Sequence, residues 1–152
     1  GYIEKRKKRD EFAGRLHSGT YKAGDKIVSR EMKELGLSLY IDAVKGKKHI
    51  SRNVFIATDD GSVTDKLKSV LVAEGFNVYW NTAVTQTGFD ESLFNTKDKK
   101  SRYIDTLNML LDMDILIHSS FFIGTYTSNV SRIVPLYVGF DKSFSLDDEW
   151  KL

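Results

Sequence analysis

The chain has 152 residues and a mass of 17.3 kDa, which is the size of one domain and enough to bury a core without disulfides. Its 23 basic and 21 acidic side chains leave a net charge of +2, which is too balanced to indicate nucleic-acid binding. There is no cysteine, which excludes a disulfide framework and a thiolate metal site. We therefore expect one globular domain over residues 1–152.

Apolar periodicity and turn residues divide the chain into alternating elements. In chain order, we expect a charged helix at 4–16, a loop at 17–25, a helix at 38–46, a strand at 53–57, a helix at 63–74, a strand at 77–80, an irregular stretch at 81–100, a helix at 102–117 and a strand at 121–124. A capping box that begins at Ser62 would start the third helix, and Gly75 would end it. Pro135 should shorten or kink the last helical pattern, and a final strand is expected within 138–150.

This alternation of strands and helices predicts an α/β fold with a parallel, Rossmann-like sheet and helices on both faces. The strands at 53–57, 77–80 and 121–124 should all belong to that sheet. Ligands of such sheets bind at the carboxyl ends of the strands. Two motifs lie there: ATDDGS after the first strand and GTYTSN after the third.

The second motif is rich in hydroxyl groups, which are carried by Thr125, Tyr126, Thr127 and Ser128. The spacing of Val130, Ile133 and Val134 predicts that a helix begins there, and its free N–H groups and partial positive charge would suit a phosphate. Serine and threonine are also the ordinary residues at helix N-termini, so Thr127 or Ser128 could be a cap and nothing more. No GxGxxG or Walker pattern accompanies the motif, which disfavours nicotinamide cofactors and P-loop nucleotide hydrolysis.

Three aspartates are further candidates. The pair Asp59 and Asp60 could bind a metal, accept hydrogen bonds from a substrate, orient a base, or only start a turn. The three histidines show no ligand spacing with each other or with the acidic pairs, so we expect no metal. Asp112 lies in the apolar segment LLDMDIL. In one interpretation, Asp112 or Asp114 simply faces solvent. In the other, Asp112 is buried and accepts hydrogen bonds from the N1–H and amino group of a guanine.

Together, VFIATDDGS and LLDMDIL followed by FFIGTYTSNVSRIV resemble the C-terminal GDP-fucose-binding domain of the alpha-1,6-fucosyltransferase superfamily. This family includes the core N-glycan and nodulation fucosyltransferases. The upstream segments YKAGDKIVSREM and YIDAV are similar to a further motif of the family, and the resemblance covers roughly residues 20–150. It implies a Rossmann-like domain that forms the C-terminal half of a two-domain glycosyltransferase. The implied reaction is inverting, metal-independent transfer of fucose from GDP-fucose to a glycan hydroxyl.

The resemblance also implies roles for individual residues. The implied catalytic residues are Asp25, Lys26 and Glu31. The implied donor-binding residues are Lys22, Asp112, Thr125, Tyr126, Thr127 and Ser128, and the implied supporting residues of the site are Tyr40, Asp59 and Asp60. Lys22 and Ala23 stand where the family has two arginines, so a point charge replaces a bidentate clamp on the diphosphate.

The partners that the resemblance implies are GDP-fucose, a glycan acceptor and an N-terminal acceptor-binding domain outside this chain. No other cofactor and no nucleic acid is expected. The Golgi lumen is implied by eukaryotic members, and the cytoplasm is the alternative; no targeting segment is recognised in this sequence. The alternative function is a non-catalytic or degenerate nucleotide-sugar-binding or structural domain, because Lys22 and Ala23 depart from the pattern of the family.

Overall fold

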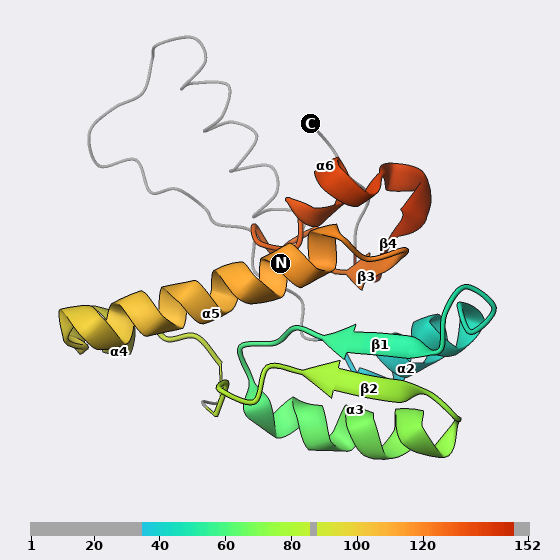
Figure 1. Ribbon diagram of the computed structural model, residues 1–152, viewed down its shortest axis with the longest axis horizontal. Helices are drawn as coiled ribbons and strands as arrows, with labels where there is room; N and C mark the ends of the chain where they lie inside the picture. Colours follow the sequence, from blue (N-terminus) through green and yellow to red (C-terminus); the bar gives the residue numbers. More distant parts are fainter. Residues whose placement is uncertain (1–34, 86–87, 148–152) are drawn as a thin grey trace, which may run out of the picture. The chain divides into compact units, whose positions relative to one another are not determined.

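The computed structural model describes residues 35–85 and 88–147, which belong to one compact unit (Figure 1). Its elements are α2 (Leu37–Gly46), β1 (Asn53–Ile56), α3 (Gly61–Ala73), β2 (Asn77–Trp80), α4 (Glu91–Thr96), α5 (Lys99–Ile117), β3 (Phe122–Gly124), α6 (Val134–Val138), the 3₁₀ turn η1 (Phe140–Lys142) and β4 (Ser143–Ser145). The protein is thus a mixed α/β structure with short strands. The helix and loop expected at 4–16 and 17–25 lie outside the described residues. In the described part of the chain, no helix is long and apolar enough to cross a membrane.

The strands form two separate parallel pairs. In the first, β1 lies beside β2, with Asn53 opposite Asn77 and Ile56 opposite Trp80, and α3 connects the two strands. In the second, β3 lies beside β4, from Phe122 opposite Ser143 to Gly124 opposite Ser145. The parallel direction agrees with the prediction from the sequence.

The prediction that the three strands at 53–57, 77–80 and 121–124 share one sheet is wrong for this structure. β3 takes its ladder hydrogen bonds from β4, which follows it in the chain, and the order of the strands is β1-β2 and β3-β4. The backbone groups of β3 that face β4 therefore find their partners in that strand and not in the first pair.

Both ends of α3 follow from local chemistry. The carboxylate of Asp60 accepts a hydrogen bond from the backbone N–H of Ser62 at 2.9 Å, so the helix begins at Gly61. The capping box predicted at Ser62 is therefore wrong, because Asp60 already caps the helix. At the other end, Gly75 has φ +84°, and the N–H of Phe76 donates to the carbonyl of Leu71 at 3.0 Å, which is a Schellman end.

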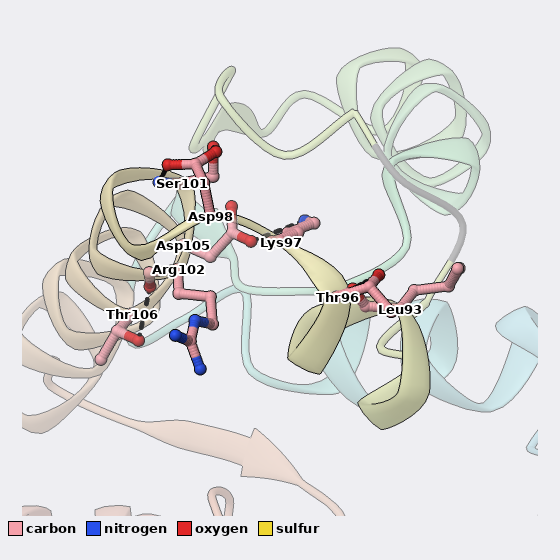
Figure 2. A network of polar contacts seen from close by, with 8 residues as sticks. All are labelled: Leu93, Thr96, Lys97, Asp98, Ser101, Arg102, Asp105 and Thr106. Carbon is pink, nitrogen blue, oxygen red and sulfur yellow. Dashed lines mark hydrogen bonds and ion pairs between the residues drawn. The ribbon is translucent and has the colours of Figure 1, made fainter.

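The stretch at 81–100 is not irregular throughout, which corrects the prediction. Asp90 begins α4 by accepting from the N–H groups of Ser92 and Leu93, and Asp98 begins α5 by accepting from those of Lys100 and Ser101. The hydroxyls of Ser92 and Ser101 strengthen these caps, and the hydrogen bonds hold the pKa of each carboxyl below its usual value. Figure 2 shows the second cap beside an ion pair of 2.6 Å between Lys97 and Asp105, which fixes the first turns of α5.

The core of the C-terminal part gathers around β3. The buried side chains of Phe122, Tyr126 and Val134 pack together, with Leu116, Ile117 and Val138 against them. As predicted from Pro135, the last helix is short, five residues long, with the proline in its first turn. Residues 126–133 form turns and a bend rather than the helix expected there. The prediction that the hydroxyl residues begin a helix is therefore wrong, because α6 starts only at Val134.

Candidate functional site

The residues Thr125–Ser128, which we call the hydroxyl turn, surround the carboxylate of Asp147. The backbone N–H groups of Tyr126 and Thr127 donate to its two oxygens at 2.7 and 3.2 Å. The hydroxyl of Thr127 donates to one oxygen, and that of Ser145 donates to the other at 2.9 Å. Four donors thus converge on one carboxylate.

The pairing of β3 with β4 brings this carboxylate to the turn. Beyond the paired residues, the N–H of Leu146 donates to the carbonyl of Gly124 at 2.9 Å, so Asp147 emerges beside the backbone of Tyr126. Two successive backbone N–H groups that point to one centre form an anion-binding concavity. The turn is therefore an anion site, and a carboxylate of the same chain fills it.

The electrostatics of Asp147 agree with this role. Burial acts to raise the pKa of its carboxyl, but the hydrogen bonds from Thr127, from Ser145 and from the two backbone N–H groups together hold that pKa below its usual value. Asp147 therefore carries a full negative charge at neutral pH. Nothing in the local sequence marked this residue as a site residue, because three of its four donors, on Tyr126 and Thr127, lie about twenty positions earlier in the chain.

Tyr40, on α2, lies at the same place. Burial raises the pKa of its hydroxyl, the negative charge of Asp147 raises it further, and a hydrogen bond with Thr125 opposes both effects. The structure thus brings Tyr40, Thr125 and Thr127 together around Asp147. All three partners were candidates from the sequence, and Asp147 was not.

The other two residues of the hydroxyl turn have different partners. The ring of Tyr126 is 6% exposed and belongs to the core, and its hydroxyl forms a hydrogen bond with Ser143. Burial raises the pKa of that hydroxyl, and the bond with Ser143 opposes the shift. The hydroxyl of Ser128 accepts from the N–H of Ser131 at 3.5 Å, inside the following turn. Within the hydroxyl turn, the hydroxyl that donates directly to Asp147 is therefore that of Thr127.

Asp112 is a buried carboxyl in the middle of α5. It is 8% exposed, and its Oδ1 accepts a hydrogen bond of 3.2 Å from the side-chain amide of Asn81, which follows β2. Burial raises the pKa of this carboxyl, and the bond from Asn81 opposes the shift. Among the residues that the structure describes, 35–85 and 88–147, no donor reaches the Oδ2 of Asp112. The side chain of Asp114 is 68% exposed, so Asp114 is the aspartate of this segment that faces solvent.

The paired aspartates stabilise local backbone. The Oδ2 of Asp59 accepts a hydrogen bond from the backbone N–H of Phe89 at 3.0 Å. The backbone carbonyl of Asp59 accepts one from the N–H of Gly88, also at 3.0 Å. Asp60 caps α3, as described above. The next residue is glycine for a steric reason, because a Cβ added at Gly61 would lie 2.7 Å from the carbonyl oxygen of Val84. Across the ranges 35–85 and 88–147, no group of three His, Cys, Asp or Glu side chains could hold a metal ion.

The remaining predicted site residues, Lys22, Asp25, Lys26 and Glu31, lie outside the described residues. No protein-family model, curated protein or solved structure matches the chain. The fold and site therefore define a mixed α/β protein with parallel strand pairs and an internally filled anion site. The resemblance to the fucosyltransferases stays a prediction.

Proposed function

We propose that the chain is the donor-binding domain of a fucosyltransferase-like enzyme, which holds GDP-fucose for inverting, metal-independent transfer to a glycan hydroxyl. The observation that carries this proposal is the buried, half-satisfied carboxylate of Asp112. A buried carboxylate is costly unless donors satisfy both of its oxygens. The N1–H and amino group of guanine are two neighbouring donors, and they suit such a carboxylate. A Rossmann-like fold belongs to the same proposal.

The diphosphate of the donor would lie at the hydroxyl turn. The N–H groups of Tyr126 and Thr127 are anion donors, and at present they hold Asp147. A phosphate that uses these donors must displace this carboxylate, because two negative charges cannot share one set of donors without strong repulsion. In this proposal Lys22 adds a positive charge to the diphosphate.

The reaction itself would need residues of the N-terminal segment. Glu31 takes the proton from the acceptor hydroxyl while the bond between fucose and phosphate breaks, and Asp25 and Lys26 lie at the reacting centre. The acceptor would be held by a separate N-terminal domain, either in the Golgi lumen or in the cytoplasm. Because Lys22 replaces the arginine clamp of the family, we expect this chain alone to bind GDP weakly. Because positioning two reactants supplies about 7–11 kcal/mol of a barrier, we expect it to transfer fucose poorly or not at all.

A second candidate is a structural or non-catalytic domain, and the filled anion site favours it. With Asp147 in place, the donors of the hydroxyl turn are satisfied without any ligand. In that case the turn is a clamp that attaches the C-terminal strand to β3, and Asp112 with Asn81 is a buried polar pair of the fold.

Isothermal titration of the 152-residue chain with GDP, and with ADP as the competing nucleotide, separates the two candidates. Asp112→Asn keeps the shape of the side chain but removes the charge that guanine would meet. A hydrogen bond to a charged group contributes about 1.5–3 kcal/mol, so GDP should bind roughly 10- to 150-fold more weakly. ADP binding should not change. Asp65→Asn, in the exposed part of α3, is the matched control.

Asp147→Asn tests the phosphate position in the same titration. If the diphosphate uses the hydroxyl turn, removing the competing charge should tighten GDP binding. Equal binding of GDP and ADP, or no effect of Asp112→Asn, would contradict the guanine site. If Asp147→Asn lowers stability and leaves GDP affinity unchanged, the turn is a structural clamp and the second candidate is favoured.

A further inference from the structure

Helix α5 exposes a row of large apolar side chains. Tyr103, Leu107 and Leu110 are 67%, 41% and 51% exposed, and Ile104 and Leu111 beside them are 45% and 51% exposed. Soluble monomers rarely leave so many neighbouring apolar side chains in water unless the patch binds something. This surface is therefore a candidate interface.

The row has the spacing of a coiled-coil seam. Lys100, Tyr103, Leu107, Leu110 and Asp114 follow each other at intervals of three and four residues, which places them on one face of a helix. Ile104 and Leu111 flank this face. Ile104 lies one helical turn before Leu107, and Leu111 lies one turn after it. We call these seven residues the α5 seam. All of them are exposed, and the one buried residue of the helix, Asp112, lies outside the seam, as do the exposed side chains of Met109 and Ile115.

The charges of the seam are reversed relative to the helix dipole. Its basic end, Lys100, lies in the first turn of α5, and its acidic end, Asp114, lies near the last. The dipole favours the opposite arrangement, with acidic groups at the N-terminus and basic groups at the C-terminus. An antiparallel helix that carries the same sequence would place an acidic group at each basic end, which would offset this cost.

The seam is also symmetric about its centre. Lys100 precedes Leu107 by seven residues, and Asp114 follows it by seven. In the same way, Tyr103 and Leu111 are equidistant from Leu107, and so are Ile104 and Leu110. We propose that α5 is the interface of a homodimer, in which two copies of this helix pack antiparallel with Leu107 at the two-fold axis.

In this dimer every residue of the seam meets a complementary one. Lys100 pairs with Asp114 of the second copy, Tyr103 packs on Leu111 of that copy, and the two Leu107 side chains meet each other. Such an isologous interface needs a self-complementary patch, and the opposite charges at the two ends of the seam supply that complementarity. The charge complementarity of the seam with itself therefore selects a second copy of the chain as its occupant.

The groups around the seam leave its charged ends available. Figure 2 shows Lys97 already paired with Asp105 and Asp98 holding the first turn of the helix, so these charges have partners within the chain. Within the described ranges, Lys100 forms no salt bridge. The Oδ1 of Asp114 lies 3.5 Å from the Nδ1 of His118, one turn further along the chain. The side chain of Asp114 is nevertheless 68% exposed.

The dimer should be of modest affinity. The helix has 19 residues, which is about 28 Å of length, and the seam covers only two heptads of it. Stable specific interfaces bury about 1,200–2,000 Å², and a pair of short helices lies at the lower end of this range. We therefore expect a dissociation constant of roughly micromolar order.

Sedimentation velocity of the 152-residue chain from about 5 to 500 µM tests the proposal. The expected result is a concentration-dependent shift from 17.3 kDa to twice this mass. Leu107→Lys places two like charges at the axis and should abolish the dimer. Lys100→Asp and Asp114→Lys each oppose like charges twice, and each should weaken association by about tenfold or more. The double variant with both changes restores both pairs and should recover the dimer.

The double variant makes the test specific, because only a self-complementary antiparallel pairing predicts its recovery. Far-UV circular dichroism and urea unfolding of each variant show whether the fold is kept. A wild-type chain that is monomeric at all concentrations overturns the proposal. A dimer that survives Leu107→Lys, or single charge changes that the double variant does not rescue, overturns it as well.

Discussion

Replacing Asp147 by asparagine keeps the shape of the side chain and removes its charge. The remaining amide oxygen can still accept from one of the two backbone N–H groups of the hydroxyl turn, but all four hydrogen bonds to the carboxylate lose the assistance of the charge. Hydrogen bonds to charged groups contribute about 1.5–3 kcal/mol and neutral ones about 0.5–1.5 kcal/mol. Because Asp147 is half-buried and water can reach it, we expect a loss of about 1.5 kcal/mol in the free energy of unfolding.

Urea unfolding followed by tryptophan fluorescence measures this loss. With a typical slope of about 1.5 kcal/mol per M, the unfolding midpoint should fall by roughly 1 M. Asp65→Asn changes an exposed aspartate of α3 and should stay within about 0.5 kcal/mol of the wild type.

The pH dependence provides an independent check. The folded pKa of Asp147 lies below its unfolded value of about 3.9, so its contribution is complete well above that pH. The contribution is lost as the pH falls through the folded pKa. The difference in stability between the wild type and Asp147→Asn should therefore be largest near neutral pH and should shrink below about pH 4. A variant as stable as the wild type at pH 7, or a difference that does not shrink in acid, would refute the role of the charged clamp.

Two further predictions concern the first strand pair and its helix. Gly61→Ala forces a Cβ to within 2.7 Å of the carbonyl of Val84 and should cost about 1–3 kcal/mol in urea unfolding, whereas Gly46→Ala, with nothing within 4 Å, should be neutral or stabilising. Leu71→Ala truncates a side chain that is 1% exposed and should lower the free energy of unfolding by about 2–5 kcal/mol. Val72→Ala, at a position that is 50% exposed, should lower it far less. Similar losses for the two variants would show that α3 does not bury the face that carries Leu71.

The parts of the fold that depend on neighbouring residues were predictable from the sequence. The strand at 77–80 has the predicted bounds, and the helix at 38–46 is correct to within one residue. Gly75 ends α3 as predicted, because only a residue that tolerates positive φ closes a Schellman end without strain. Asp90 and Asp98 carried cap signals as well, but the polar sequence around them lacks apolar periodicity, and α4 was missed.

The pairing of strands and the content of the anion site could not be predicted in this way. The partner of β3 depends on which backbone reaches its edge, and β4 reaches it after a connection of eighteen residues that no local pattern describes. The sequence left the hydroxyl turn open between a phosphate site and a helix cap, and the carboxylate that the turn holds, Asp147, comes from the distant tail. For Asp112, the sequence left burial and exposure open, and in the structure its side chain is buried and accepts a hydrogen bond from Asn81, which follows β2.

The ladder between β3 and β4 and the carboxylate of Asp147 tie together the two ends of the segment 124–147. This segment is therefore a closed loop that can open only when both ties break, so its amides should exchange with solvent water as one cooperative unit. Tyr137 and Phe140, 68% and 49% exposed, lie between the ties and are natural positions for a chymotryptic cut. Such a cut would leave the two fragments attached through the ladder and the clamp, and the nicked protein would fall apart only at the rate at which the loop opens.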